Sequence, residues 1–285
     1  MIKNITVCGA GTMGRGIAQV SAQFGYNVRL FDLKQEQLDN AMNAIRRNLD
    51  KGVARGKTTV EEQERCLANL RVYTSLGEAC TDCDLFIEAV PEQLALKHKI
   101  LCEVEGYVSK ECILGTNTSS LSIADVAQPL SHPERLLGTH FFNPVHIMKL
   151  LELVYHEGTA QSVIESIQSY GGTIQKECIL VRNAPGFATS RLGVALGMEA
   201  IRMLEEGVAS AEDIDKAMVL GYRHPIGPLK LTDLVGLDVR MHIGTYLSQA
   251  LNNDAFSPPE LMKQMVEEGK LGKKTGIGFY DYSDS

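Results

Sequence analysis

One histidine and one glutamate stand in a mostly apolar stretch, and this pairing is suited to acid-base chemistry. His140 lies twelve residues before Glu152, which falls within the hydrophobic run of residues 147–154. A carboxylate buried alone is costly to ionise, whereas one hydrogen-bonded to an imidazole fixes its tautomer and stabilises the imidazolium. Asn143-Pro144 favours a turn that would bring the two side chains together as a general-base dyad. The alternative is a core histidine with satisfied hydrogen bonds and a glutamate on an edge strand.

A glycine-rich turn near the N-terminus predicts the element that would bring a cofactor to these residues. Apolar residues 2–7 predict a strand, and a G-x-G-x-x-G pattern follows it and leads into a helix-like segment. In this pattern the glycines permit a tight turn, a close approach of a pyrophosphate, and tight helix-strand packing. A dinucleotide would then bind at the helix N-terminus. The cofactor-binding residues expected here are Gly9, Gly11, Thr12, Met13 and Gly14.

An acidic residue at the end of the second predicted strand indicates which dinucleotide binds. The strand spans residues 27–31 and is followed by Asp32, 18 residues after the last glycine of the motif. An acid at about this spacing accepts hydrogen bonds from the ribose hydroxyls and would repel a 2′-phosphate. We therefore predict NAD as the cofactor, although Lys34 nearby leaves residual NADP use open.

Polar residues follow two further predicted strands. One strand, which begins at Asp84, delivers Glu88 and Glu92 to a loop. The other, residues 112–116, is followed by Asn117, Thr118, Ser119 and Ser120. Ligands of open α/β sheets bind at the carboxyl ends of the strands. Contact with substrate or nicotinamide is therefore as good an interpretation of these residues as a helix cap.

The sequence predicts a Rossmann-like doubly wound α/β sheet in residues 1–184 and an all-helical domain in residues 185–285. Helical spacing of apolar residues covers residues 190–206 and, as a single predicted helix, residues 229–251. A basic segment in the first domain, Lys51 to Lys57, is either a solvated helix end or a site for a phosphate-rich ligand.

The composition excludes several classes of protein. A net charge of −7 and a pI near 5.6 argue against a general surface for nucleic acid or anionic membranes. We expect no membrane span and no export signal, because no apolar run is long enough. The seven cysteines are scattered, which fits reduced thiols in a cytoplasmic protein, and the lone pair Cys80 and Cys83 is expected to be structural. We expect no metal site.

Several motifs, in order along nearly all of the chain, resemble those of the 3-hydroxyacyl-CoA dehydrogenase family. The resemblance is nearest to its bacterial 3-hydroxybutyryl-CoA dehydrogenase members. The motifs are G-A-G-T-M-G from Gly9, I-E-A-V-P-E from Ile87, T-N-T-S-S-L-S-I from Thr116, H-F-F-N-P-V from His140, A-P-G-F from Ala184, E-D-I-D-K-A-M from Glu212, H-P-I-G-P-L from His224 and D-L-V-G-L-D from Asp233.

The resemblance implies a reaction and an assembly. The reaction is reversible NAD-linked oxidation of an (S)-3-hydroxyacyl-CoA, with a short acyl chain expected, to the 3-ketoacyl-CoA. The C-terminal domain is expected to contribute to substrate binding and to form a homodimer. His140 would be the general base and Glu152 would orient it, while Ser119 and Asn143 would hydrogen-bond the reacting oxygen.

The resemblance also implies further binding residues. Lys51, together with Arg55 or Lys57, falls near the family's CoA-phosphate contacts. The residues expected on the nicotinamide side of the cofactor site are Glu92, Lys97 and Asn117.

One position departs from the family pattern. Ser190 stands where many members have an asparagine near the substrate, and we expect this to alter the range of acyl chains and not the reaction class.

Two alternative functions stay open on the sequence. One is an NAD-dependent dehydrogenase of a CoA-free 3-hydroxy acid or sugar acid. The other is an NAD-binding protein without turnover.

Overall fold

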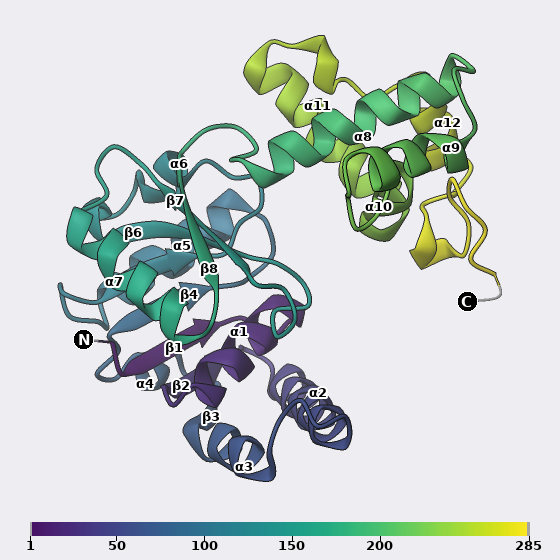
Figure 1. Cartoon of the computed structure of the whole chain (residues 1–285). Coiled ribbons are helices and arrows are strands. Elements are labelled where there is room, and N and C mark those ends of the chain that lie inside the picture. The colour runs from purple at the N-terminus through teal and green to yellow at the C-terminus, as the bar shows by residue number, and fades with distance from the viewer. Residues whose placement is uncertain (1, 284–285) are drawn as a thin grey trace. The chain divides into compact units, whose positions relative to one another are not determined.

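The computed structural model describes residues 2–283, which divide into two compact units (Figure 1). The first unit ends at Asn183 and the second begins at Ala184. The first contains a sheet with helices and the second is built from helices, so the predicted fold class is confirmed. Within residues 2–283, no helix combines the length and the apolar character that a bilayer crossing needs.

The first unit is organised around an eight-stranded sheet with the order β3-β2-β1-β4-β5-β6-β7-β8. Neighbouring strands are parallel except for β6 and β7, which are antiparallel. The chain runs outward from β1 to β3 and then returns to β4 on the other side of β1. This switch point is where open α/β sheets bind their ligands. The strands are β1 (Asn4–Cys8), β2 (Asn27–Phe31), β3 (Leu70–Tyr73), β4 (Leu85–Glu88), β5 (Ile113–Thr116), β6 (Leu136–Phe141), β7 (Leu150–Tyr155) and β8 (Glu177–Arg182).

The central strands are apolar along nearly their whole length because both faces of the sheet are covered. Ile5, Val7, Leu85 and Ile87 are fully buried in one core cluster, which also contains Ile17 from the first helix. The helices of this unit are α1 (Thr12–Gln23), α2 (Gln35–Ala54), α3 (Val60–Asn69), α4 (Leu76–Ala79), α5 (Leu94–Glu105), α6 (Ile123–Ala127) and α7 (Gln161–Thr173), with a 3-10 turn, η1, at Pro133–Arg135.

Two of these elements, α3 and β3, lie where apolar periodicity predicted none. Helix α3 buries only Cys66, and the four-residue β3 buries only Leu70, so each has too few apolar positions to show a periodicity. A capping box does begin α3, because the Thr59 side chain accepts from Glu62 N while the Glu62 carboxylate accepts from Thr59 N. That T-x-x-E signature was the available sequence signal.

The second unit has its own apolar core, which includes Met198, Ile201, Leu229 and Leu247. Residues 229–251, predicted as one helix, form two. The prediction was wrong because Gly236 between them has φ +103°, a backbone conformation that ends a helix. The elements are α8 (Thr189–Glu205), α9 (Ala211–Lys216), η2 (Ala217–Gly221), α10 (Pro228–Val235), α11 (Leu237–Leu251), η3 (Asp254–Phe256), α12 (Glu260–Glu267) and η4 (Lys273–Thr275).

Candidate active site

His140 and Glu152 face each other across the antiparallel pair of β6 and β7. The two residues are directly opposite in the strand register, and His140 Nδ1 lies 2.8 Å from Glu152 Oε2. A carboxylate only accepts hydrogen bonds, so Nδ1 carries the hydrogen and Nε2 of the neutral ring keeps its lone pair. The Glu152 side chain is completely buried, whereas that of His140 is 9% exposed. The buried acid therefore orients an imidazole that is itself nearly buried.

The chain reverses between the two strands as the sequence predicted. The peptide bond between Asn143 and Pro144 is cis. Pro144 O then accepts hydrogen bonds from Ile147 N and Met148 N, both at 2.9 Å, which closes a single turn. Asn143 is exposed at the start of this turn, three residues after His140. The turn thus carries Asn143 and joins the strands of both dyad residues.

Glu92 organises the polar loop after β5. Its Oε1 accepts from Thr118 Oγ1 at 2.5 Å, from Ser119 N at 3.0 Å and from Ser120 N at 3.2 Å. Burial by itself raises the pKa of Glu92, but the nearby Lys97 cation and these hydrogen bonds outweigh burial and lower it. The carboxylate is therefore held ionised, and it fixes the backbone that carries Ser119.

Asn117 ties this loop to the strand of the histidine. Its Oδ1 accepts from Phe141 N at 3.0 Å, and Phe141 is the residue after His140. Its backbone N donates to Glu88 O at 2.7 Å. The structure thus places Asn117, predicted to bind the cofactor, between the ends of β4 and β6, where it joins the Ser119 loop to the dyad.

A fully buried ion pair lies behind the loop. Lys97 Nζ donates to Glu88 at 2.8 and 2.9 Å and lies 3.3 Å from both Glu92 Oε2 and Asn117 O. Thr116 Oγ1 donates to the same Glu88 carboxylate at 2.6 Å. Burial raises the pKa of Glu88 even though Lys97 counteracts it.

The Lys97 side chain has no exposed surface and bridges two carboxylates. Its place on the nicotinamide side of the cofactor site stays a prediction. Glu88, the closer of the two partners of Lys97, was not assigned a role from the sequence. The only indication of one in the sequence was weak, because Glu88 is an acid that ends an otherwise apolar strand.

The dinucleotide turn fits its predicted ligand in shape. A Cβ on Gly14 would lie 1.7 Å from Gly9 O, and Gly9 itself has φ +102°. A Cβ on Gly11 would meet nothing within 4 Å, so the turn is open on the side where a pyrophosphate would approach. No side chain caps α1 at Gly11, which leaves its first N–H groups available to an anion. Thr12 and Met13 form the first turn of this helix.

Asp32 lies at the end of β2 beside this turn. Its Oδ2 accepts from Ala10 N at 2.9 Å and its Oδ1 accepts from Lys34 N at 3.1 Å. It borders a cavity of about 340 Å³ at the carboxyl ends of β1 and β2. This cavity is lined by Cys8, Gly9, Phe31, Asp32, Leu33, Thr74, Leu76, Val90, Pro91, Leu96, Lys99, Ile100 and Glu103.

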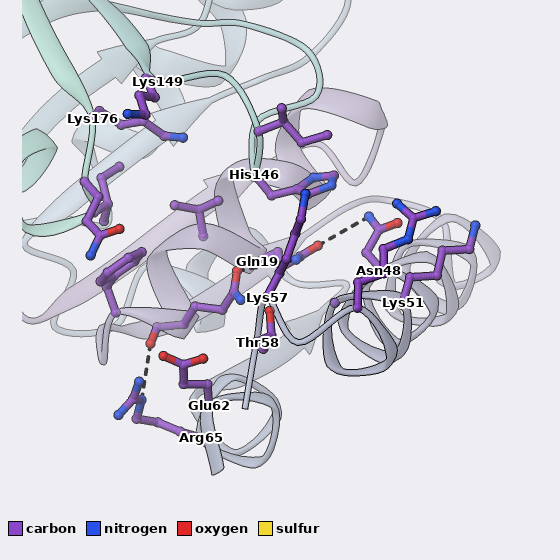
Figure 2. A pocket seen from close by; sticks show the side chains of 18 residues that line it. Gln19, Asn48, Lys51, Lys57, Thr58, Glu62, Arg65, His146, Lys149 and Lys176 are labelled. Carbon is purple, nitrogen blue, oxygen red and sulfur yellow. Dashed lines mark hydrogen bonds between the residues drawn. The ribbon is translucent and has the colours of Figure 1, made fainter. Parts of the chain in front are cut away.

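A second cavity in the first unit, of about 530 Å³, has a strongly basic lining (Figure 2). It is bordered by α1, by the end of α2 with the loop that follows, and by the turn after Asn143. Its cationic side chains include the three predicted near the CoA phosphates, and Glu62 adds one opposite charge. The lysines and arginines are Lys51, Arg55, Lys57, Arg65, Lys149 and Lys176. We refer to it below as the basic cavity.

Ser190 is half-buried in the first turn of α8, which belongs to the second unit. In the first unit, hydrogen bonds connect His140 with Glu152 and join Phe141, beside His140, to Asn117 of the Ser119 loop, while Asn143 follows three residues after His140.

Comparison with known proteins assigns the family. Residues 4–184 match the family model described as 3-hydroxyacyl-CoA dehydrogenase, NAD binding domain. Residues 186–282 match 3-hydroxyacyl-CoA dehydrogenase, C-terminal domain. The chain belongs to the 3-hydroxyacyl-CoA dehydrogenase family. It is therefore an NAD-dependent oxidoreductase, and the resemblance found in the sequence is confirmed.

Individual members of the 3-hydroxyacyl-CoA dehydrogenase family cover the chain completely or nearly so. The 3-hydroxybutyryl-CoA dehydrogenase of Mycobacterium tuberculosis is 40% identical over 283 residues, or 99% of each chain. The solved structure of (S)-3-hydroxybutyryl-CoA dehydrogenase from Ralstonia eutropha is 37% identical, with a TM-score of 0.96 over 100% of both chains. The 3-hydroxyadipyl-CoA dehydrogenase of Escherichia coli is 39% identical over 99% of this chain and 59% of its own. Relatives at similar identity are thus named for different acyl groups.

The buried ion pair generates a prediction on stability. Lys97→Met leaves the Glu88 carboxylate buried and uncompensated, and we expect the free energy of unfolding to fall by about 3–5 kcal/mol. Urea denaturation followed by circular dichroism measures this. Lys99→Met, on the exposed face of the same helix, is the control and should change stability by less than about 0.5 kcal/mol. A loss below about 1 kcal/mol in Lys97→Met would mean that the pair contributes little.

Proposed function

We propose that this protein reversibly oxidises (S)-3-hydroxyacyl-CoA to 3-ketoacyl-CoA with NAD, and that its substrate has a short acyl chain such as 3-hydroxybutyryl. The observation that carries the proposal is the buried His140–Glu152 pair, joined at 2.8 Å, with the adjacent Phe141 N bonded to Asn117 before the Ser119 loop. The names of the full-length relatives support the acyl-CoA and its stereochemistry.

The geometry suits His140 to move the proton of the substrate hydroxyl. With Nδ1–H donated to Glu152, the lone pair on Nε2 accepts that proton during oxidation, and the buried carboxylate stabilises the imidazolium that results. In reduction the imidazolium returns the proton. When bound, NAD supplies the hydride acceptor. Asn143 and Ser119 hydrogen-bond the reacting oxygen and so limit its position relative to His140.

Removal of the base tests this function directly. We expect His140→Gln to lower kcat by about two to four orders of magnitude, the usual share of general acid-base catalysis, with little change in NADH affinity. The measurement is loss of NADH absorbance with acetoacetyl-CoA. His132→Gln, a histidine outside the site, serves as the control. Near-normal turnover in His140→Gln would remove this residue from the proposed role.

The basic cavity supports CoA as the carrier of the acyl group. Its lysines and arginines offer charge-assisted hydrogen bonds to phosphates, and Lys51 and Arg55 are the residues that we propose for this contact. The Lys51 side chain is exposed, so its ion pair with a phosphate is partly screened by solvent and salt.

Lys51→Met is therefore predicted to raise KM for acetoacetyl-CoA by about two- to fivefold at unchanged kcat, because an exposed ion pair contributes at most about 1 kcal/mol. Initial rates at several salt concentrations measure this, and added salt should raise the wild-type KM. Lys110→Met is the control, an exposed lysine outside the cavity.

Equal kcat/KM on free acetoacetate would favour the CoA-free alternative. NADH binding without NADH consumption would favour the alternative without turnover.

Ser190 is proposed to tune the acyl chain. Its hydroxyl is shorter than the asparagine amide that many family members have, so Ser190→Asn is expected to shift kcat/KM between acetoacetyl-CoA and longer 3-ketoacyl-CoA substrates. Rates on a series of chain lengths give the ratio. An unaltered ratio would show that this residue does not determine chain preference.

A homodimer in the cytoplasm completes the proposal. The helical unit exposes large apolar side chains on several elements, among them Leu192, Leu220 and Leu234, and such surface is typical of subunit interfaces. All seven cysteines are free thiols, which suits a reducing compartment. A monomeric mass by light scattering would contradict the dimer.

A further inference from the structure

The turn that follows Asn143 has carbonyl groups that its own hydrogen bonds do not satisfy. Residues 144–148 form one closed turn between β6 and β7, and a single helical turn leaves its last C=O groups without intrahelical partners. Lys176 satisfies two of them, because its Nζ donates to Val145 O at 2.5 Å and to Met148 O at 2.7 Å. The cation thus caps the turn in the manner of a residue at a helix C-terminus.

Lys176 reaches the turn from the connection between α7 and β8. It precedes Glu177, whose backbone N donates to Lys149 O at 2.8 Å just before β7 begins. Figure 2 shows Lys176 beside Lys149, on the same side of the basic cavity. The side chain is about half-buried, and burial lowers the pKa of its ammonium. In this partly buried position, the two carbonyl dipoles that the ammonium contacts stabilise its charge.

The opposite side of the turn packs against the cofactor helix. Val145 is 2% exposed, and a Cβ added to Gly16 of α1 would lie 2.8 Å from Val145 Cγ2. The absence of a side chain at Gly16 therefore lets the turn approach the helix that begins at the dinucleotide motif. The turn is held from two directions, by α1 and by Lys176, and Asn143 is the residue immediately before it.

We propose that Lys176 is a positioning residue of the active site, which holds residues 144–148 and thereby fixes Asn143 relative to His140. This inference rests on the proposed function, in which Asn143 contacts the reacting oxygen. Lys176 also borders the basic cavity, so a contact with CoA phosphates is the competing role. The two roles predict different behaviour toward a substrate that has no phosphates.

The experiment compares Lys176→Met on two substrates, acetoacetyl-CoA and S-acetoacetyl-N-acetylcysteamine. The second keeps the reacting thioester and lacks the nucleotide and its phosphates. A positioning role predicts that kcat falls by about 10- to 100-fold on both substrates, since a displacement of about 1 Å at a reacting group can cost that much. NADH affinity, measured by fluorescence titration, should stay the same.

Lys149→Met is the matched control, because it removes an equal charge from the same cavity. Any loss that comes from cavity charge should appear in both variants with acetoacetyl-CoA and disappear with the truncated thioester. If Lys176→Met loses activity only on acetoacetyl-CoA, Lys176 is a phosphate contact and the inference is wrong. Unchanged kcat on both substrates would overturn it as well.

A second variant covers the case in which Lys176→Met does not fold. Val145→Ala loosens the same turn where it meets α1, and it should also lower kcat on both substrates; an unchanged kcat would overturn the inference. Failure of the wild type to consume NADH with either substrate would refute the proposed function itself. An active wild type with an unaffected Lys176→Met would refute only the positioning role.

Discussion

The hydrogen bond between His140 Nδ1 and Glu152 Oε2 constrains how the strands of the first unit are arranged. It needs two strands that run antiparallel in a sheet that is otherwise parallel, and a register in which these residues lie opposite each other. A slip of one residue would turn Glu152 to the other face of the sheet. The complete burial of Glu152 makes such a slip costly, because an ionised carboxylate without its partner is poorly tolerated there.

The groups around the dyad are held by buried polar contacts that join neighbouring strand ends. Glu88 at the end of β4 binds Lys97 and Thr116, while Glu92 collects the hydrogen bonds of the Ser119 loop. Asn117 then links that loop to β6 through Phe141 N. One cation, Lys97, faces both the Glu88 and Glu92 carboxylates, and hydrogen bonds from Thr116 and the Ser119 loop offset part of the cost of burying them. A rigid frame of this kind suits a reaction whose rate depends on the placement of a few atoms.

The sequence by itself was sufficient for the local features. Glycines at fixed spacing, an apolar strand before them and Asp32 after the second strand predict the dinucleotide turn, because each depends on a few adjacent residues. Asn143-Pro144 likewise predicts the reversal that brings His140 to Glu152. The ordered motifs were enough to recognise the family, which the matches over residues 4–184 and 186–282 confirm.

Tertiary structure decided the features that depend on distant residues. Lys97 Nζ lies 3.3 Å from Asn117 O, twenty residues later in the chain, and no local pattern indicates that contact. Lys176 contacts carbonyls about thirty residues earlier in the chain, and no periodicity or motif marks a lysine for that role. Helix α3 was missed because it buries only one side chain. Patterns in a sequence indicate which residues are apolar and where the backbone turns. The partner of a buried charge, by contrast, is determined only by which residues the folded chain brings into contact with it.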